Sequence, residues 1–164
     1  MTRQFALPFV HVESYGPDFL AAHSNAAALT WLQRTPAWPQ GRLAVWGECG
    51  SGKTHLLHLW ARREGAAVIP GTLLRATPVA GPLAIDDADT AGERPLLHTL
   101  NSAGEARYPV LLVGREPPAR WRVALPDLAS RLRAITAVAI EPPEDSLLRA
   151  LLAKLIADRE LAVG

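Results

Sequence analysis

Residues 47–54 have the types and spacing of a phosphate-binding loop. Their sequence, GECGSGKT, satisfies the pattern G-x-x-x-x-G-K-[ST]. Glycines permit positive φ and a close backbone approach, while the lysine and the following hydroxyl suit the terminal phosphates and Mg²⁺. We therefore expect the loop to bind ADP or ATP together with Mg²⁺. The expected nucleotide-binding residues are Gly47, Glu48, Cys49, Gly50, Ser51, Gly52, Lys53, Thr54 and the adjoining His55.

Two consecutive carboxylates follow a second apolar run, PLAI at residues 82–85. This arrangement is typical of the strand that carries a carboxylate to the Mg²⁺ of a phosphate-binding loop. Asp86, together with Thr54, is the expected metal-side residue. Asp87 occupies the position of the acid that orients an attacking water, although aspartate is shorter than the commoner glutamate.

The elements that must position these residues alternate between strands and helices. The apolar run 43–46 feeds the loop as a strand, and residues 54–64 leave it as a helix that Gly65 ends. Further strands are expected at residues 66–69, 82–86, 109–113 and 134–140, and further helices at 25–34, 94–106 and 127–133. Short runs that are apolar on both faces predict an α/β fold, in which a five-stranded parallel sheet carries helices on both faces.

The bulk composition indicates one globular domain without a general attraction to polyanions. The chain has 164 residues, 49% of them hydrophobic, and 17 basic against 16 acidic residues give a net charge of +1. We expect no direct sequence-specific DNA binding and no membrane association. One cysteine and no targeting segment predict a cytoplasmic location, and a homo-oligomer is left open.

The two ends of the chain are expected to form segments separate from the central nucleotide-binding region. Residues 1–12 are predicted to be a flexible arm in which Pro8 excludes a helix, and residues 13–142 to form the nucleotide-binding base. After residues 141–143, leucines recur at helical spacing. Residues 143–164 are therefore expected to be the first helix of a small lid domain that is largely missing from the chain.

The motifs together resemble the ATPase domain of the bacterial replication initiator DnaA, which belongs to the AAA+ P-loop ATPases. The resemblance rests on GKTHLLH at residues 52–58, on Asp86 and Asp87, and on HTLN at 98–101. Residues 19–25 resemble the segment near the adenine, which implies a nucleotide contact for Asn25. Residues 126–131 resemble the segment with the arginine finger, which implies that Arg131 acts catalytically in trans on a partner's nucleotide.

The N-terminal arm resembles the peptide by which Hda-like regulators, homologues of DnaA, bind the DNA polymerase sliding clamp. The implied partner-binding residues are Gln4, Phe5, Leu7, Pro8 and Phe9. This resemblance implies a nucleotide-binding regulator whose partners are the sliding clamp and DnaA, and which stimulates ATP hydrolysis by DnaA. Weak or no hydrolysis of its own is expected.

The sequence departs from the family at residues 113–115, where VGR replaces a small polar or acidic residue, and it lacks the lid's second sensor arginine. Arg115 and Arg133 are further candidates for a partner interface. One alternative is an autonomous AAA+ ATPase, such as a helicase-loader-like or initiator-related protein. A small-molecule kinase with a P-loop is the least favoured class, because neither a substrate pocket nor an arginine-bearing lid is visible.

Overall fold

Five parallel strands form the centre of the computed structural model, which describes residues 26–141. The strands are β1 (Arg42–Trp46), β2 (Ala67–Pro70), β3 (Leu83–Asp86), β4 (Val110–Gly114) and β5 (Thr136–Ala139). They lie in the order β2-β3-β4-β1-β5, and every neighbouring pair is parallel. The predicted five-stranded parallel α/β sheet is therefore confirmed.

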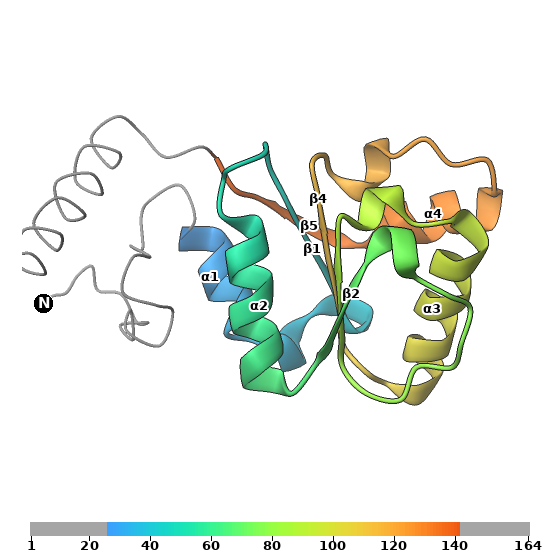
Figure 1. The fold of residues 1–164 in the computed structure, drawn as a ribbon, viewed down its shortest axis with the longest axis horizontal. Helices are drawn as coiled ribbons and strands as arrows, with labels where there is room; N and C mark the ends of the chain where they lie inside the picture. The colour runs from blue at the N-terminus through green and yellow to red at the C-terminus, as the bar shows by residue number, and fades with distance from the viewer. Residues whose placement is uncertain (1–25, 142–164) are drawn as a thin grey trace, which may run out of the picture.

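Helices cover both faces of this sheet, as the alternating pattern predicted. Helices α1 (Ala26–Leu32) and α2 (Lys53–Glu64) lie on one side, and α3 (Glu93–Ala106) and α4 (Pro126–Ala134) lie on the other (Figure 1). Each side has its own apolar cluster, one containing Leu57 of α2 and the other Leu100 of α3. Both of these leucines are fully buried, so the sheet is enclosed between two helical layers.

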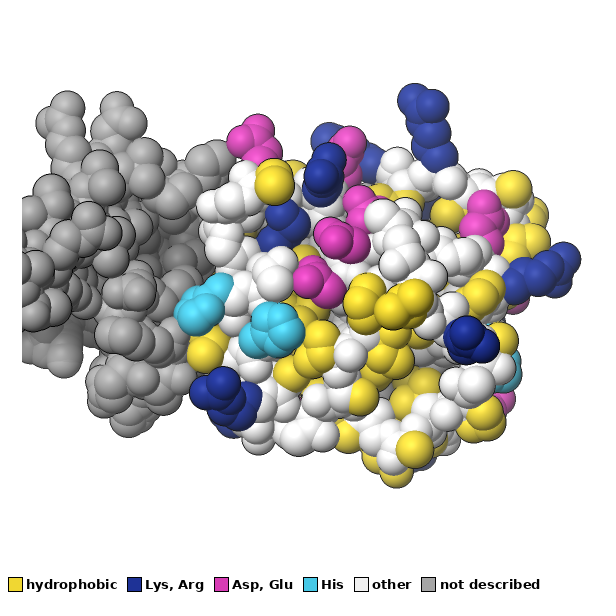
Figure 2. Space-filling model, viewed as in Figure 1, with side chains coloured by type: hydrophobic (Ala, Val, Ile, Leu, Met, Phe, Trp, Pro, Cys, Tyr) yellow, Lys and Arg dark blue, Asp and Glu magenta, His cyan; other side chains and the backbone are white. Residues whose placement is uncertain are grey.

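Strand β2, like the other edge strand β5, departs from the expectation that the strands are buried. Strands β1 and β4 are buried over nearly their whole length, whereas Ala67, Val68 and Pro70 of β2 are exposed. This strand pairs with β3 alone because it forms one edge of the sheet. Hydrophobic side chains, coloured yellow, accordingly reach the surface at the centre of Figure 2.

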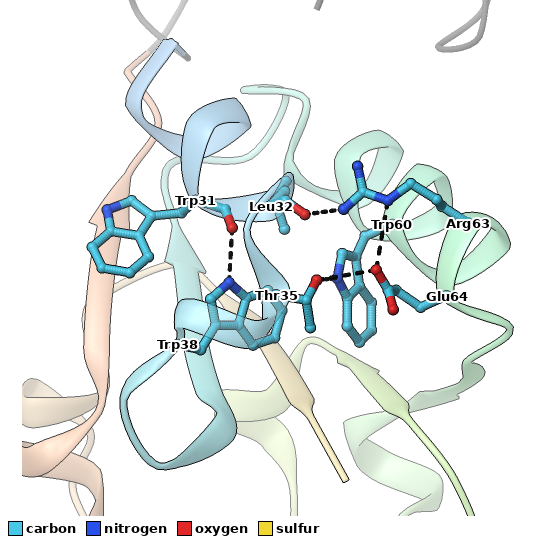
Figure 3. A network of polar contacts seen from close by, with 7 residues as sticks. All are labelled: Trp31, Leu32, Thr35, Trp38, Trp60, Arg63 and Glu64. Atoms are coloured by element: carbon cyan, nitrogen blue, oxygen red, sulfur yellow. Dashed lines mark hydrogen bonds and ion pairs between the residues drawn. The ribbon is translucent and has the colours of Figure 1, made fainter.

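A tryptophan cluster fixes the phosphate-loop helix to the segment that follows α1 (Figure 3). Trp38 and Trp60 stack with their ring centroids 5.2 Å apart. Trp60 Nε1 donates a 2.9 Å hydrogen bond to Thr35 Oγ1, and that hydroxyl donates to Glu64 Oε2 at 3.1 Å. These tryptophans pack inside the domain, and their polar contacts orient α2, whose first residues belong to the loop.

Several predicted features lie outside residues 26–141. They are the arm with Gln4, Phe5, Leu7, Pro8 and Phe9, the adenine-side Asn25, and the lid helix at residues 143–164. Within the described range, the longest helix is α3 with 14 residues, and no helix there has the length and apolar character needed to cross a bilayer.

Candidate nucleotide-binding site

The loop at residues 47–54 joins the end of β1 to the start of α2, and its glycines serve different purposes. Gly50 and Gly52 have φ of 85° and 97°, a conformation that side chains disfavour. Gly47 has no positive φ. A Cβ built on Gly47 would lie 2.4 Å from the carbonyl oxygen of Ile140. A glycine is therefore required at position 47 because the chain after β5 approaches closely. Glycines are favoured at positions 50 and 52 because the turn into α2 needs a positive φ.

Two polar side chains of the loop, those of Lys53 and Ser51, are buried. Lys53 is only 7% exposed, and its Nζ donates a 2.9 Å hydrogen bond to the carbonyl oxygen of Glu48. Ser51 Oγ is buried and has no hydrogen-bond partner among the described residues. Glu48, Cys49 and His55 are exposed at the rim. A buried cation beside an unused hydroxyl, at the N-terminus of a 12-residue helix, suits a phosphate group.

The sheet brings Asp86 to this loop, although 32 residues separate it from Thr54. Thr54 Oγ1 donates to Asp86 Oδ1 at 3.3 Å. Mg²⁺ in nucleotide sites takes one or two carboxylates and hydroxyls together with phosphate oxygens. The described residues contain no group of three His, Cys, Asp or Glu side chains that could hold a metal alone. Thr54 and Asp86 thus fit an ion that is bound together with the nucleotide.

Asp87 stands next to Asp86 in a strained backbone conformation. Its φ of 50° is one of only three positive values at non-glycine residues in the described range. Its N–H donates to Asp86 Oδ1 at 3.0 Å, and its carbonyl oxygen accepts a 2.6 Å hydrogen bond from Thr90 Oγ1. The Asp87 side chain is exposed. These two hydrogen bonds hold Asp87 in this conformation at the carboxyl end of β3, the edge at which the loop begins.

The end of β4 lies between the phosphate loop and Asp86, because β4 separates β1 from β3 in the sheet. Its last residue is Gly114, whose carbonyl oxygen accepts a hydrogen bond from the N–H of Gly47 at 3.1 Å. A Cβ at this position would lie 2.9 Å from Trp121 Cζ2. Trp121 is held there by a 2.9 Å hydrogen bond from Nε1 to the carbonyl oxygen of Glu116. A side chain at position 114 would therefore require the indole to shift.

The structure does not bring Arg131 to the phosphate loop of its own chain. Arg131 belongs to α4, its side chain is 37% exposed, and its Nη2 lies 3.8 Å from Asp127 Oδ1. Arg115 and Arg133 are exposed. The residues that converge at one place are therefore the loop with Asp86 and Asp87, and Arg131 remains a candidate for contact with another molecule.

Two neighbours of the site are not predicted by the sequence. Ile140 and Trp121 shape the loop and the end of β4 through tertiary contacts, and neither carries a motif. The only sequence signals were Gly47 and Gly114, since a glycine in a buried position indicates close packing by an unknown partner.

No protein-family model matches the sequence, and no curated protein matches it. Solved structures do match the fold. Domain III of the replication initiation protein DnaA from Thermotoga maritima has a TM-score of 0.67 and 18% identity, over 87% of this chain and 73% of that chain. AMPPCP-bound DnaA from Aquifex aeolicus has a TM-score of 0.64 and 17% identity, over 75% and 48%.

A RuvB variant from Thermotoga maritima is also similar, with a TM-score of 0.56 and 20% identity over 85% of this chain and 53% of that chain. The chain thus spans about half the length of the Aquifex DnaA and of RuvB. At sequence identities of 17–20%, these similarities establish the fold alone. The chain has the α/β fold of the AAA+ P-loop ATPases, in which five parallel strands place the phosphate-binding loop beside the carboxylates of β3.

Proposed function

We propose that this chain is a nucleotide-binding regulator of bacterial DNA replication initiation. In this function it binds ADP or ATP with Mg²⁺, attaches to the sliding clamp through residues 4–9, and stimulates the hydrolysis of ATP by DnaA. The observation that carries the proposal is the convergence of Lys53, Thr54 and Asp86 on one loop of an AAA+ fold. The likeness to DnaA, including a form bound to AMPPCP, supports it.

A regulatory purpose fits the site better than rapid turnover. Hydrolysis needs polar groups that orient water and stabilise the charge on the transferred phosphoryl group. The position between the loop and Asp86 is Gly114, which offers no polar side chain, and a Cβ there would require Trp121 to shift. In this proposal the bound nucleotide shapes the surface that contacts a partner. The ATP that is hydrolysed is the one bound in the partner's site.

In this function Arg131 contributes a charge to the ATP of DnaA. Its side chain is partly exposed, and its ion pair with Asp127 is long and connects exposed residues of one helix. Such pairs contribute only about 0.3–0.5 kcal/mol. Arg131 can therefore leave Asp127 for a phosphate at little cost. An arginine that reaches a partner's γ-phosphate typically accelerates hydrolysis by about 10³-fold or more.

The decisive test measures hydrolysis of DnaA-bound ATP in the presence of DNA-loaded clamp. We expect the full chain to stimulate hydrolysis and Arg131→Ala to reduce this stimulation by about 10²-fold or more, while clamp binding is retained. Gln4→Ala is expected to weaken clamp binding. Arg122→Ala, at an exposed arginine outside the candidate interface, and Thr2→Ala in the arm are the controls. No stimulation by a folded, clamp-bound full chain rules out the proposed function.

An autonomous ATPase is the second candidate, and the strained backbone of Asp87 favours it. This residue stands beside Asp86 with a positive φ, and such strain often marks catalytic positions. The second candidate requires ATP turnover by the isolated chain and its loss in Asp87→Asn. Turnover that persists in Asp87→Asn excludes this role for Asp87.

A further inference from the structure

The connection between β2 and β3 contains no α-helix. Parallel neighbouring strands are usually joined by a helix that packs on the sheet. Residues 71–82 form the connection here, and their only regular element is the three-residue 3₁₀ helix Gly71–Leu73. A pocket of about 460 Å³ lies beside this connection, and β2, the start of β3 and Thr99 of α3 complete its lining. The pocket thus occurs where the expected crossover helix is absent.

The lining of this pocket is mainly aliphatic, and part of it is in contact with water. The large apolar residues that line it are Ile69, Leu73, Leu74, Val79 and Leu83. Leu73 is 65% exposed, and among the described residues only Leu73 and Val68 are large hydrophobic residues with exposed side chains. Both belong to β2 or to the turn that follows it. Exposed apolar surface around a pocket of this volume is typical of a ligand-binding site.

The polar groups at the pocket are donors without an anion. Arg75 is the only charged residue that lines it. None of the ion pairs between described residues includes Arg75. The N–H groups of Ala80 and Gly81, two consecutive lining residues, form no hydrogen bond in the described part of the chain. An aliphatic pocket with a guanidinium and unused N–H donors suits a ligand that has an apolar body and an anionic head.

We propose that this pocket binds a small aliphatic carboxylate. Its hydrocarbon chain lies against the aliphatic lining and covers part of Leu73, and its carboxylate contacts Arg75. The bidentate geometry of a carboxylate matches the planar guanidinium. Binding thereby removes apolar surface from water and supplies the anion that Arg75 lacks.

The free edge of β2 fits an added protein strand less well. The N–H of Ala67 donates to the carbonyl oxygen of Pro82, next to the paired residue Leu83 of β3. Successive residues of a parallel strand direct their backbone groups to opposite sides, so Val68 and Pro70 face the free edge. Pro70 has no N–H, and an added strand would therefore lack one of its hydrogen bonds. This favours a small molecule over a second copy or a peptide strand.

The pocket is distinct from the nucleotide site. Ala67 and Leu83, the first residues of β2 and β3, belong to its lining. Asp86, which contacts Thr54 of the phosphate loop, is instead the last residue of β3. The carboxylate site goes beyond the proposed function and does not depend on it.

Methyl NMR titrations of the full chain test the proposal with octanoate, octanol and octylammonium. We expect octanoate to shift the methyl resonances of Leu73, Leu74 and Val79 with one dissociation constant. Octanol is expected to bind about tenfold more weakly, because it cannot form a charge-assisted contact with Arg75. Octylammonium is expected to bind still more weakly, since its charge opposes that of Arg75. Octanol binding as tightly as octanoate overturns the proposal.

Two variants separate the head of the ligand from its chain. Arg75→Gln is expected to weaken octanoate binding about tenfold and to leave octanol binding unchanged. Arg94→Gln, at an exposed arginine of α3 outside the lining, is the matched control and should change neither. Gly81→Leu is expected to abolish binding of both ligands by filling the pocket. Gly81 has no positive φ, and a Cβ there would meet no atom within 4 Å.

Unchanged octanoate binding in Gly81→Leu, or equal losses in Arg75→Gln and Arg94→Gln, overturns the proposal. So does a dimer of the parent chain, seen by sedimentation, that dissociates in Gly81→Leu, because the pocket then belongs to a second copy. If Gly81→Leu does not fold, Arg75→Gln still decides, since Arg75 is exposed. The DnaA assay does not involve this pocket, so the two hypotheses can fail separately.

Discussion

Glycines of one sequence motif can meet different physical requirements, as the phosphate-binding loop illustrates. Gly50 and Gly52 adopt positive φ, and a Cβ at either position would meet no atom within 4 Å. Gly47 has an ordinary backbone but touches the carbonyl of Ile140. Substitution thus strains the backbone at the first two positions, whereas at Gly47 it forces two chain segments apart.

These two mechanisms predict different stabilities for two alanine variants. Gly50→Ala is expected to lower the free energy of unfolding by about 1–2 kcal/mol, the cost of a left-handed conformation at a residue with a Cβ. Gly47→Ala is expected to cost about 3 kcal/mol or more, because its Cβ would lie 2.4 Å from a backbone oxygen. Urea unfolding measures both. Gly81→Ala, in open space, is the control, and an equal effect of Gly47→Ala and Gly50→Ala contradicts the prediction.

Helices α3 and α4 are connected at their N-terminal ends by a single carboxylate. Glu93 is the first residue of α3, and its Oε1 accepts 2.9 Å hydrogen bonds from the N–H groups of Ala124 and Leu125. Leu125 immediately precedes α4 and has no capping side chain of its own. Glu93 therefore caps a neighbouring helix across the domain, and its charge also suits the positive end of both helices.

This contact predicts a pH-dependent contribution to stability. The hydrogen bonds from Ala124 and then Leu125 hold the pKa of Glu93 below its ordinary value of 4.5. A lowered pKa in the folded state means that the contribution is present above the ordinary value and is lost as the pH falls through the folded value. Chemical unfolding across this range is expected to show Glu93→Gln less stable than the parent near neutrality, with the difference shrinking in acid.

Glu105→Gln provides the matched control for that measurement, since Glu105 is an exposed residue of the same helix. Its effect on stability is expected to be small at every pH. A difference between parent and Glu93→Gln that stays constant down to strongly acidic pH contradicts the capping role.

At the scale of the whole molecule, the strand order assembles the site. Chain segments ending at Trp46, Asp86 and Gly114 finish at the same edge because β1, β4 and β3 are parallel neighbours. Helix α2 and the tryptophan cluster lie on one face, and α3 and α4 lie on the other (Figure 1). A nucleotide bound at this edge, as we propose, would lie beside β1, α2 and β3, and its binding would therefore be coupled to the stability of the domain.

Nucleotide binding is accordingly expected to stabilise the whole domain. ADP with Mg²⁺ at a hundred times its dissociation constant raises the free energy of unfolding by about 2.7 kcal/mol if it binds only the folded chain. Thermal unfolding with and without ADP measures the effect. Lys53→Ala should abolish most of it, whereas His58→Ala, an exposed position of the same helix, should preserve it. An unchanged effect of ADP in Lys53→Ala means that the loop does not hold the phosphates.

The sequence by itself determined the strands and helices and the position of the loop among them. The alternation of apolar runs and helical patterns predicted all five strands and the four helices of the described region, because short buried strands and amphipathic helices have distinct periodicities. The motifs likewise predicted that Asp86 lies beside the loop, where Thr54 donates a hydrogen bond to it. The strands and helices follow from local periodicity. The position of Asp86 follows from an arrangement of strands that recurs in proteins with such loops.

Only the tertiary structure decided which side chains pack against the loop and the end of β4, and which strand is exposed. Trp121 packs against position 114, Ile140 requires a glycine at 47, and β2 is an exposed edge strand. Arg42 donates to the carbonyl oxygen of Leu100 across 58 positions of the sequence. No periodicity encodes such encounters, because they depend on which elements pack together and on where each side chain then points.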